Sequence, residues 1–464
     1  MITARLCLAV VLTTPLLGAA PVPLRFEECP PGVDPALECA QLEVPLDHAN
    51  PDGRTLSVAV SRIRASGTPE EYRGALLVNP GGPGGSGLEY AATKRAKLPE
   101  SVQRSYDIIG FDPRGVGRSA PVDCGPAGGL FDHPTADPVD EDAFLAGLKR
   151  ISDDCVKHIG EVRPHINTAN TARDMDLLRR ALGQPELNYL GVSYGTYLGA
   201  AYAAEFPEHV GRMVLDSVVS PDDWHTFDVK QGFAMIEQRD VLLRWIAAHP
   251  TTGLGSTPEE VRANYDRARG LLTGHPEFGP GEFDRLVYRT LSRTERWEPF
   301  ARALATYLQT GDTTGFGPAE PTDRNYEAAL RTVKCADSPR PSTSDVTGAV
   351  RALRAADPQP VLTGLEAATC AYWPEPHEPA RLGSNDIPPV LLTQASHDPT
   401  TPLAGAREMQ ARLGGSHMVT LHNSYSHGVF ASQRNPCVDD TAAAYLVDGA
   451  VPAGDVECSG AGLP

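Results

Sequence analysis

The chain has 464 residues, 41% of them hydrophobic, and a formal net charge of −18. This length can bury a large core, in one elaborated domain or in two. The acidic balance and the lack of a long lysine or arginine run exclude nucleic acid and anionic membrane surfaces as expected partners.

Residues 1–20 have the pattern of a secretory signal peptide. Arg5 precedes the apolar run 6–17, and the small residues 18–20 supply a cleavage site. The run is too short for a membrane anchor, and no later stretch is apolar enough over a sufficient length to span a bilayer. We therefore expect export to the extracellular space or the cell envelope.

The cysteine count agrees with export. Of nine cysteines, Cys7 lies within the signal, which leaves 9 − 1 = 8. An even number in an exported chain predicts disulfides, and a metal site is disfavoured because no Cys-x-x-Cys spacing occurs. We expect no metal and no cofactor. Proximity along the sequence favours the pairs Cys29 with Cys39, Cys124 with Cys155, Cys335 with Cys370, and Cys437 with Cys458.

The first predicted strands lead into a glycine-rich loop. Stretches 40–45 and 55–63 alternate around an Asn-Pro-Asp-Gly turn and predict a hairpin. The apolar stretch 74–78 predicts a buried strand, and the loop 79–87 follows it directly. Such a loop brings backbone N–H groups close to a ligand. A linker or a phosphate cradle is the other interpretation, disfavoured by the preceding strand and by the absence of a Lys-Ser/Thr ending.

The next strand, 106–111, runs into the turn 112–119 (DPRGVGRS), which we interpret as structural support for the loops around a site. A direct catalytic role for Asp112 is the less favoured interpretation. Residues 121–170 are expected to form a loop-rich excursion held by one disulfide. The amphipathic pattern of 172–182 then predicts a helix that ends at a glycine.

A nucleophile elbow is predicted at Ser193. The apolar run 187–190 predicts a strand, Gly191 and Gly195 flank Ser193 in a Gly-x-Ser-x-Gly pattern, and a helix of small residues follows to 205. This layout lifts a serine hydroxyl clear of a sheet, at the positive end of a helix. The alternative is an ordinary strand-to-helix turn with a capping serine.

The following block differs in pattern. A strand at 212–219 carries Asp216, and from 221 to 388 amphipathic helical segments punctuated by proline and glycine replace strands. They are expected at 233–248, 258–272, 281–292, 299–310 and 326–333. Strands return at 389–393 and 418–421, with helices at 403–413 and 440–446. We therefore expect a helical cap inserted into a sheet domain.

A catalytic triad completes the site. An elbow serine needs a histidine base and a carboxylate that orients it, in the chain order Ser, Asp or Glu, His. Asp398 follows one late strand and His427 follows the next, at the sheet end where Ser193 lies. Asp216 is the alternative acid, and His397 and His422 are the alternative bases. We expect the N–H groups of Gly82 and Tyr194 to bind the oxyanion.

Several motifs together resemble one family. They are 79–87 (NPGGPGGSG), 110–119 (GFDPRGVGRS), 191–199 (GVSYGTYLG), 398–402 (DPTTP), 427–430 (HGVF) and the cysteine-bearing tail. The mature chain resembles the secreted tripeptidyl aminopeptidases, relatives of proline iminopeptidase within the α/β-hydrolase superfamily. Ser193, Asp398 and His427 match that family's triad. The family more often has small residues just before the histidine. This sequence has Tyr425 and Ser426 there, a difference that we expect to alter the leaving-group side of the pocket.

The resemblance implies an α/β-hydrolase fold: a mostly parallel sheet with helices on both faces and an inserted helical cap. The expected limits are 1–20 for the signal peptide, 21–220 and 389–464 for the core, and 221–388 for the cap. It also implies a serine exopeptidase, expected as a monomer, that releases short peptides, tripeptides above all, from free N-termini. The cap would block internal sites.

Two other functions are open at this point. An exported carboxylesterase or lipase would use the same triad, and a non-catalytic binding protein of the same fold would not use it. An aminopeptidase needs carboxylates in the cap to hold the substrate's ammonium group, because a desolvated charge without a partner is costly. The candidates are Glu237, Asp240, Glu295, Glu298 and Asp337.

Overall fold

The computed structural model describes residues 23–125, 140–275, 278–317, 323–357, 365–374 and 379–464. The predicted signal peptide and Cys7 lie outside the described residues. Within them, no helix combines the length and the apolar character needed to cross a membrane.

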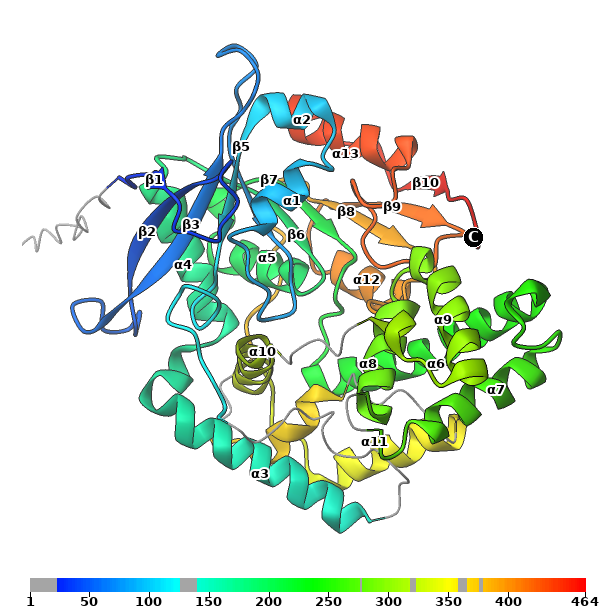
Figure 1. Ribbon diagram of the computed structural model, residues 1–464. Coiled ribbons are helices and arrows are strands. Elements are labelled where there is room, and N and C mark those ends of the chain that lie inside the picture. Colours follow the sequence, from blue (N-terminus) through cyan, green and yellow to red (C-terminus); the bar gives the residue numbers. More distant parts are fainter. Residues whose placement is uncertain (1–22, 126–139, 276–277, 318–322, 358–364, 375–378) are drawn as a thin grey trace, which may run out of the picture.

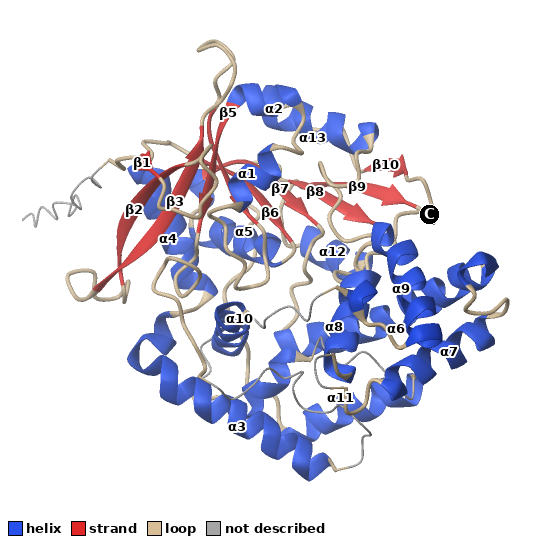
Figure 2. Ribbon diagram, viewed as in Figure 1, coloured by secondary structure: helices blue, strands red, loops and turns tan. Residues whose placement is uncertain are grey.

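A ten-stranded sheet forms the centre of the molecule (Figure 2). Its strands lie in the order β1-β2-β3-β5-β4-β6-β7-β8-β9-β10. The first three pair antiparallel, β3 is antiparallel to β5, and the pairs from β5 to β10 are all parallel. The bounds are β1 Glu27–Glu28, β2 Glu38–Pro45, β3 Thr55–Ile63, β4 Gly74–Asn79, β5 Tyr106–Phe111, β6 Leu187–Val192, β7 Val210–Asp216, β8 Leu391–Ala395, β9 His417–His422 and β10 Val456–Ser459.

The burial of each strand follows its place in the sheet. The edge-side strand β2 alternates buried and exposed residues, whereas every residue of β4 and β8 is buried. Parallel strands covered by helices on both faces are expected to read as continuous apolar runs. The expected mostly parallel sheet with helices on both faces is therefore confirmed.

Helices cover both faces of the sheet (Figure 1). On one face lie α1 Tyr90–Arg95, α2 Glu100–Ser105 and α13 Pro436–Asp448, and on the other α4 Thr168–Ala181, α5 Tyr194–Glu205 and α12 Leu403–Gln410. The side chains on the α13 face form one hydrophobic cluster, and those around α4 and α5 belong to another.

Between β7 and β8 the chain forms a layer of helices beyond the sheet (Figure 1). They are α6 Trp224–Ala248, α7 Pro258–Leu271, α8 Pro280–Leu291, α9 Trp297–Thr310, α10 Arg324–Asp337 and α11 Thr343–Ala356. Residues of α6 to α9 enclose a third hydrophobic cluster, which includes Leu242, Tyr265, Phe283 and Trp297. The segment from α6 to α9 therefore has a core of its own, whereas buried residues of α10 and α11, such as Ala328 and Val346, belong to the cluster around α4 and α5.

The expectation of a loop-rich excursion at 121–170 is wrong over much of its length. Residues Glu141–Ile159 form the 19-residue helix α3, and η1 (Gly160–His165) follows it. The side chain of Asp140 caps α3 by accepting from Ala143 N, and one face of the helix, including Leu148 and Ile151, is buried. The helix packs against η7, Glu366–Tyr372, beside the helices of the inserted layer. Its i, i+3, i+7 pattern of apolar residues was visible in the sequence.

Four disulfides are present among the described residues. They join Cys29 to Cys39, Cys124 to Cys155, Cys335 to Cys370, and Cys437 to Cys458, which are the pairs predicted from proximity in sequence. The first connects the chain beside β1 to β2, and the last connects α13 to β10.

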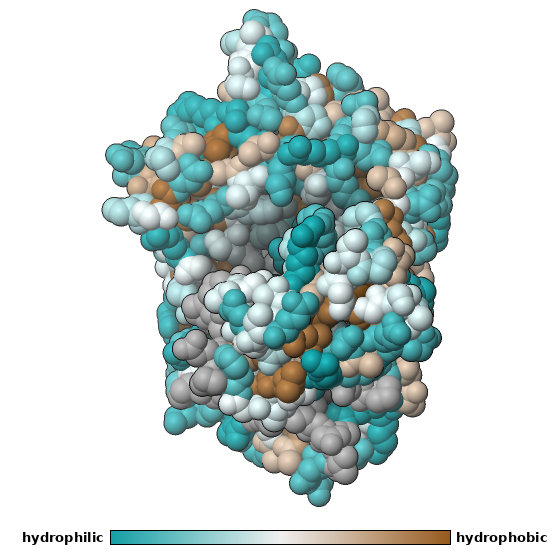
Figure 3. Space-filling model, turned by 45° about the vertical axis from the view of Figure 1, so that its right-hand side comes forward, coloured by the Kyte–Doolittle hydropathy of each residue, from teal (hydrophilic) through white to brown (hydrophobic). Residues whose placement is uncertain are grey.

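Hydrophilic side chains cover most of the face drawn in Figure 3, with hydrophobic ones in small areas. This distribution suits a chain whose net charge is −18.

Candidate active site

Ser193 occupies a strained turn between β6 and α5. Its backbone has φ 58° and ψ −127°, a conformation that costs a non-glycine residue about 1–3 kcal/mol. Small neighbours make the turn possible: a Cβ on Gly191 would lie 2.3 Å from the carbonyl oxygen of Gly195, and one on Gly199 would lie 2.8 Å from Leu215. The predicted elbow is therefore present, in place of an ordinary capped turn.

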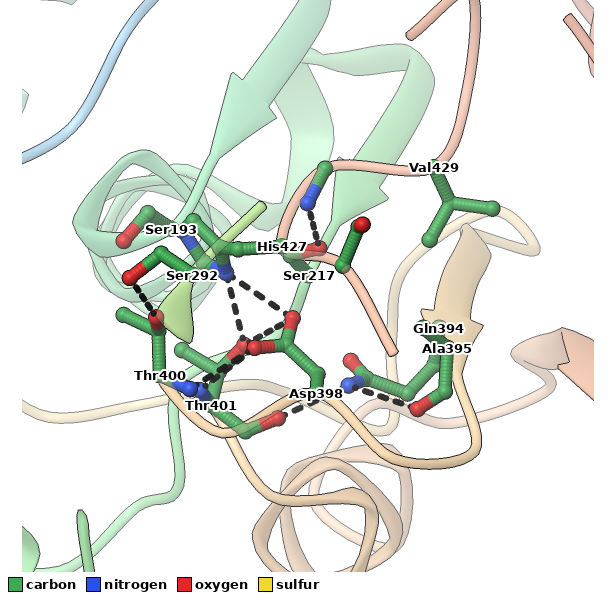
Figure 4. Close-up of polar contacts among 12 residues, drawn as sticks. Ser193, Ser217, Ser292, Gln394, Ala395, Asp398, Thr400, Thr401, His427 and Val429 are labelled. Carbon is green, nitrogen blue, oxygen red and sulfur yellow. Dashed lines mark hydrogen bonds and ion pairs between the residues drawn. The ribbon is translucent and has the colours of Figure 1, made fainter. Parts of the chain in front are cut away.

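Asp398 and His427 lie together beside Ser193 (Figure 4). They follow β8 and β9, and Nδ1 of His427 is 2.8 Å from Oδ2 of Asp398. The aspartate also accepts hydrogen bonds from the N–H groups of Thr400 and Thr401 and from the hydroxyl of Thr401. Burial alone would raise the pKa of this carboxyl, but His427 and the hydrogen bonds from Thr401 hold it below its usual value. Asp398 is thus equipped to remain an anion.

The alternative acid, Asp216, has a different environment. Its Oδ1 accepts from the hydroxyl of Thr393 and from the backbone N–H of Val429. The ammonium group of Lys94 lies 4.0 Å from Oδ2 and donates to the carbonyl of Phe430. Burial raises the pKa of Asp216 and lowers that of Lys94 to about 8. This buried pair holds the backbone of the loop that follows His427.

The alternative bases contact other groups. The ring of His397 stacks on Tyr425 with centroids 4.5 Å apart, and the half-exposed His422 bonds Glu457 through Nε2. Neither residue lines the cavity described below.

The glycine-rich loop lies against the elbow. A Cβ on Gly81 would come within 2.4 Å of the carbonyl oxygen of Val192 and 3.0 Å of the nitrogen of Tyr194. Gly82 lines the same cavity as Ser193. The N–H of Tyr194 belongs to the first turn of α5, where helix geometry provides no intrahelical acceptor. Of the two predicted oxyanion donors, Gly82 thus lies on the cavity wall and Tyr194 in the first turn of the elbow helix.

The turn 112–119 supports this loop. Asp112 accepts from the hydroxyl of Ser86 and from the N–H of Leu88, at the end of the glycine-rich loop. Arg114 is buried and forms two hydrogen bonds with Asp174 of α4. Both side chains therefore have the structural role predicted for this turn.

A cavity of about 950 Å³ opens onto Ser193 and His427. Part of its wall is aromatic, with Trp224, Phe227 and Tyr326, and part is charged. The charged lining residues are Glu282, Arg285, Arg289, Arg293, Arg296, Asp323, Glu327, Lys334 and Glu366. These charged groups make the wall more polar than the mainly apolar wall of a typical small-ligand site.

The five carboxylates that the sequence suggested as amine anchors are not among the residues lining this cavity. Asp337, for example, is buried and accepts from the N–H and hydroxyl of Thr168, while the exposed Glu298 pairs with Arg302. The carboxylates that do line the cavity come from α8, from η7, and from α10 and its N-cap. The direction in which each of these side chains points depends on how the helices pack together. No local sequence signal marks them.

A buried cluster of opposite charges occupies one side of the cavity. The ammonium group of Lys334 lies 2.7 Å from Oδ1 of Asp228 and 2.7 Å from Oε2 of Glu366. Asp228 has no exposed side-chain surface, whereas Glu366 reaches the cavity. Burial raises the pKa of Asp228, which also accepts from the N–H of Ala367.

Comparisons with known proteins agree with this geometry. A family model described as alpha/beta hydrolase fold matches residues 74–430. The chain is 35% identical to the tripeptidyl aminopeptidase of Streptomyces coelicolor, over 95% of this chain and 87% of that protein. It is 29% identical to the serine protease Hip1 of Mycobacterium tuberculosis, over 90% and 87% of the two chains. It is 30% identical to the carboxylesterase B of the same species, over 91% and 86%. The chain therefore belongs to the α/β-hydrolase family, as a relative of the tripeptidyl aminopeptidases.

Proposed function

We propose that this protein is an exported serine exopeptidase that releases short peptides, mainly tripeptides, from free N-termini. The observation that carries the proposal is one cavity that combines an elbow serine, a histidine bonded to a buried aspartate, and a charged wall of cap residues. Residues 221–388 would act as the cap that closes this cavity to internal segments of long chains.

The proposed chemistry proceeds through an acyl-enzyme. His427 takes the proton of Ser193 as its oxygen attacks the scissile carbonyl, and Asp398 stabilises the imidazolium that results. The N–H groups of Gly82 and Tyr194 bind the oxyanion. His427 then gives the proton to the departing amine as the C–N bond breaks. Water, deprotonated by His427, attacks the ester on Ser193 and releases the peptide acid.

We propose Glu366 as the carboxylate that holds the substrate's ammonium group. Lys334 lies between two carboxylates, so the cluster has one negative charge in excess when both are ionised. Two other lining carboxylates pair with arginines, Glu327 with Arg331 at 2.9 Å and Glu282 with Arg285 at 2.8 Å. Glu366, in contrast, shares the ammonium group of Lys334 with Asp228. Asp323 is exposed and caps α10. Glu366 is thus the partly buried carboxylate best placed to balance an incoming cation.

The eight paired cysteines support export, because disulfides persist in oxidising compartments. N-terminal sequencing of the protein from culture medium would test this: a mature chain that begins near residue 21 is expected. Recovery of the intact chain inside the cell would contradict it.

The proposal is tested with the p-nitroanilide of trialanine, with its N-terminus free and then acetylated. We expect the free form to be cleaved at least about tenfold faster, which corresponds to about 1.4 kcal/mol. Glu366→Gln should raise KM for the free form and reduce this preference, while Ser193→Ala should abolish both turnover and labelling by a fluorophosphonate. Equal rates for both forms would argue against an exopeptidase. Turnover of short-chain esters alone would favour the carboxylesterase function.

A further inference from the structure

The connection between α8 and α9 bonds to the loop that carries His427. The N–H of His427 donates to the carbonyl of Ser292 at 2.9 Å. Two residues further on, the N–H of Thr294 donates to the hydroxyl of Ser426 at 3.0 Å, and the two hydroxyls are also 3.0 Å apart. Ser292 additionally reaches the hydroxyl of Thr400, beside Asp398. Arg293 therefore stands between two residues that are bonded to the triad loops.

This attachment places the Arg293 guanidinium beside the backbone that follows His427. A Cβ on Gly428, the residue after His427, would lie 3.5 Å from Nη2 of Arg293. Arg293 lines the cavity together with Ser193 and His427, and Arg296 lines it from the same connection.

The positive charge of Arg293 is only weakly balanced by the protein. Its ion-pair partner among the described residues is Glu295, at 3.9 Å, and these side chains are 32% and 65% exposed. Exposed pairs of this kind contribute about 0–1 kcal/mol because water and ions screen them. An incoming carboxylate can therefore compete for this guanidinium, whose planar N–H groups match two carboxylate oxygens.

We propose that Arg293 forms a carboxylate-binding subsite on the leaving-group side of Ser193. The inference rests on the proposed exopeptidase function. His427 must hand a proton to the departing amine, so the leaving portion of the substrate passes beside His427 and Gly428. Arg293 lies beside Gly428, where this amine departs, whereas Glu366 is proposed to hold the N-terminal portion that stays on Ser193, so we assign a carboxylate near Arg293 to the portion that leaves.

Two sources can supply this carboxylate. It is either the C-terminus of a short leaving group, as in a tetrapeptide, or an acidic side chain just after the scissile bond. The enzyme would then prefer short peptides with a free C-terminus, or longer ones with aspartate or glutamate after the third residue.

The test uses matched peptides with a free N-terminus. Trialanyl-glycine is compared with its C-terminal amide, and trialanyl-glutamine amide is compared with trialanyl-glutamic acid amide. We expect wild-type kcat/KM to favour the carboxylate-bearing member of at least one pair by about tenfold, equivalent to about 1.4 kcal/mol. The first pair reports a terminal carboxylate and the second reports a side chain.

Arg293→Gln should bring that ratio close to one, and Arg293→Lys should retain part of it because the charge remains. Each rate is divided by the rate of the same variant on trialanine p-nitroanilide, so general damage to the enzyme cancels. The control is Arg302→Gln, an exposed arginine of α9 paired with Glu298, which should keep the wild-type ratio.

Wild-type ratios within about twofold of one for both pairs would overturn the subsite, as would an unchanged ratio in Arg293→Gln. Neither result affects the exopeptidase proposal as long as the free p-nitroanilide is cleaved. Failure to cleave any of these peptides would instead contradict the exopeptidase proposal itself.

Discussion

Replacing Lys94 by methionine should destabilise the protein strongly, although the side chain is nearly isosteric. Lys94 is 2% exposed, and its ammonium group is 4.0 Å from the carboxylate of Asp216, which has no exposed surface. Among the described residues, Oδ2 of Asp216 has no hydrogen-bond partner. The substitution would thus leave a buried carboxylate without its cation and would also remove the donor to the carbonyl of Phe430.

The expected loss is about 4 kcal/mol, because breaking a buried ion pair from one side costs about 3–5 kcal/mol. The double variant Lys94→Met, Asp216→Asn removes both charges and keeps a side-chain oxygen for Val429. It should lose only about 1–2 kcal/mol, from the unpaired carbonyl of Phe430. The double variant should therefore be more stable than the single one.

Acid should reduce the penalty of the single variant. Without the lysine, burial would raise the folded-state pKa of Asp216 further above its usual value. A raised carboxyl pKa means that the folded state binds the proton more tightly, so stability falls as pH rises through that range. The loss in Lys94→Met should consequently be smaller near about pH 5 than near about pH 7.

Guanidinium chloride unfolding, followed by fluorescence of the four tryptophans, measures these differences. Lys97→Met, an exposed lysine three positions away, is the matched control and should change stability by less than about 0.5 kcal/mol. A loss below about 1 kcal/mol in Lys94→Met, or a double variant less stable than the single one, would refute the reasoning.

Two further predictions concern other carboxylates. Asp398→Asn should lower kcat by about three to four orders of magnitude while leaving KM nearly unchanged, because the imidazole of His427 loses the anion that fixes its tautomer. Steady-state kinetics measures this, and a decrease in kcat below about tenfold would argue against a triad role for Asp398. Burial raises the pKa of Asp337 to about 7 in the folded protein. Between about pH 4 and pH 7 this carboxyl is therefore ionised in the unfolded chain but still protonated in the folded one, so the wild type loses stability as pH rises. Denaturant titrations of the wild type and of Asp337→Asn measure this effect. Between about pH 5 and pH 8 the free energy of unfolding of the wild type should fall by about 3 kcal/mol more than that of the variant, and parallel pH profiles of the two would contradict the prediction.

The strands and the elbow were predictable because local sequence determines them. The buried parallel strand β4 has a continuous apolar run, and Ser193 is marked by its flanking glycines. The pairing of Asp398 with His427 followed from chain order and from the common edge at which parallel strands end.

Other elements were missed for identifiable reasons. The helix α11 has apolar residues at i, i+3, i+4 and i+7 (Val346, Ala349, Val350 and Leu353) and a capping box at Ser342, so its signal was present in the sequence and was overlooked. The strand β10 has only four residues at the sheet edge, which is too short for a clear alternating pattern. The partners of Lys334 depend on how α6, α10 and η7 pack together, which no short window of sequence encodes.

The cysteine pairing has a consequence for how the chain matures. The partners are separated by 10, 31, 35 and 21 residues, and each pair closes before the next begins. A polypeptide that emerges from its N-terminus can therefore oxidise each pair in turn, so that no earlier thiol waits for a distant partner. The first and last disulfides also attach the two outermost strands to the rest of the fold, β1 to β2 and β10 to α13. The unpaired backbone groups of such edge strands can otherwise pair with another chain. Oxidation in this order would protect one edge of the sheet at the start of maturation and the other at its end.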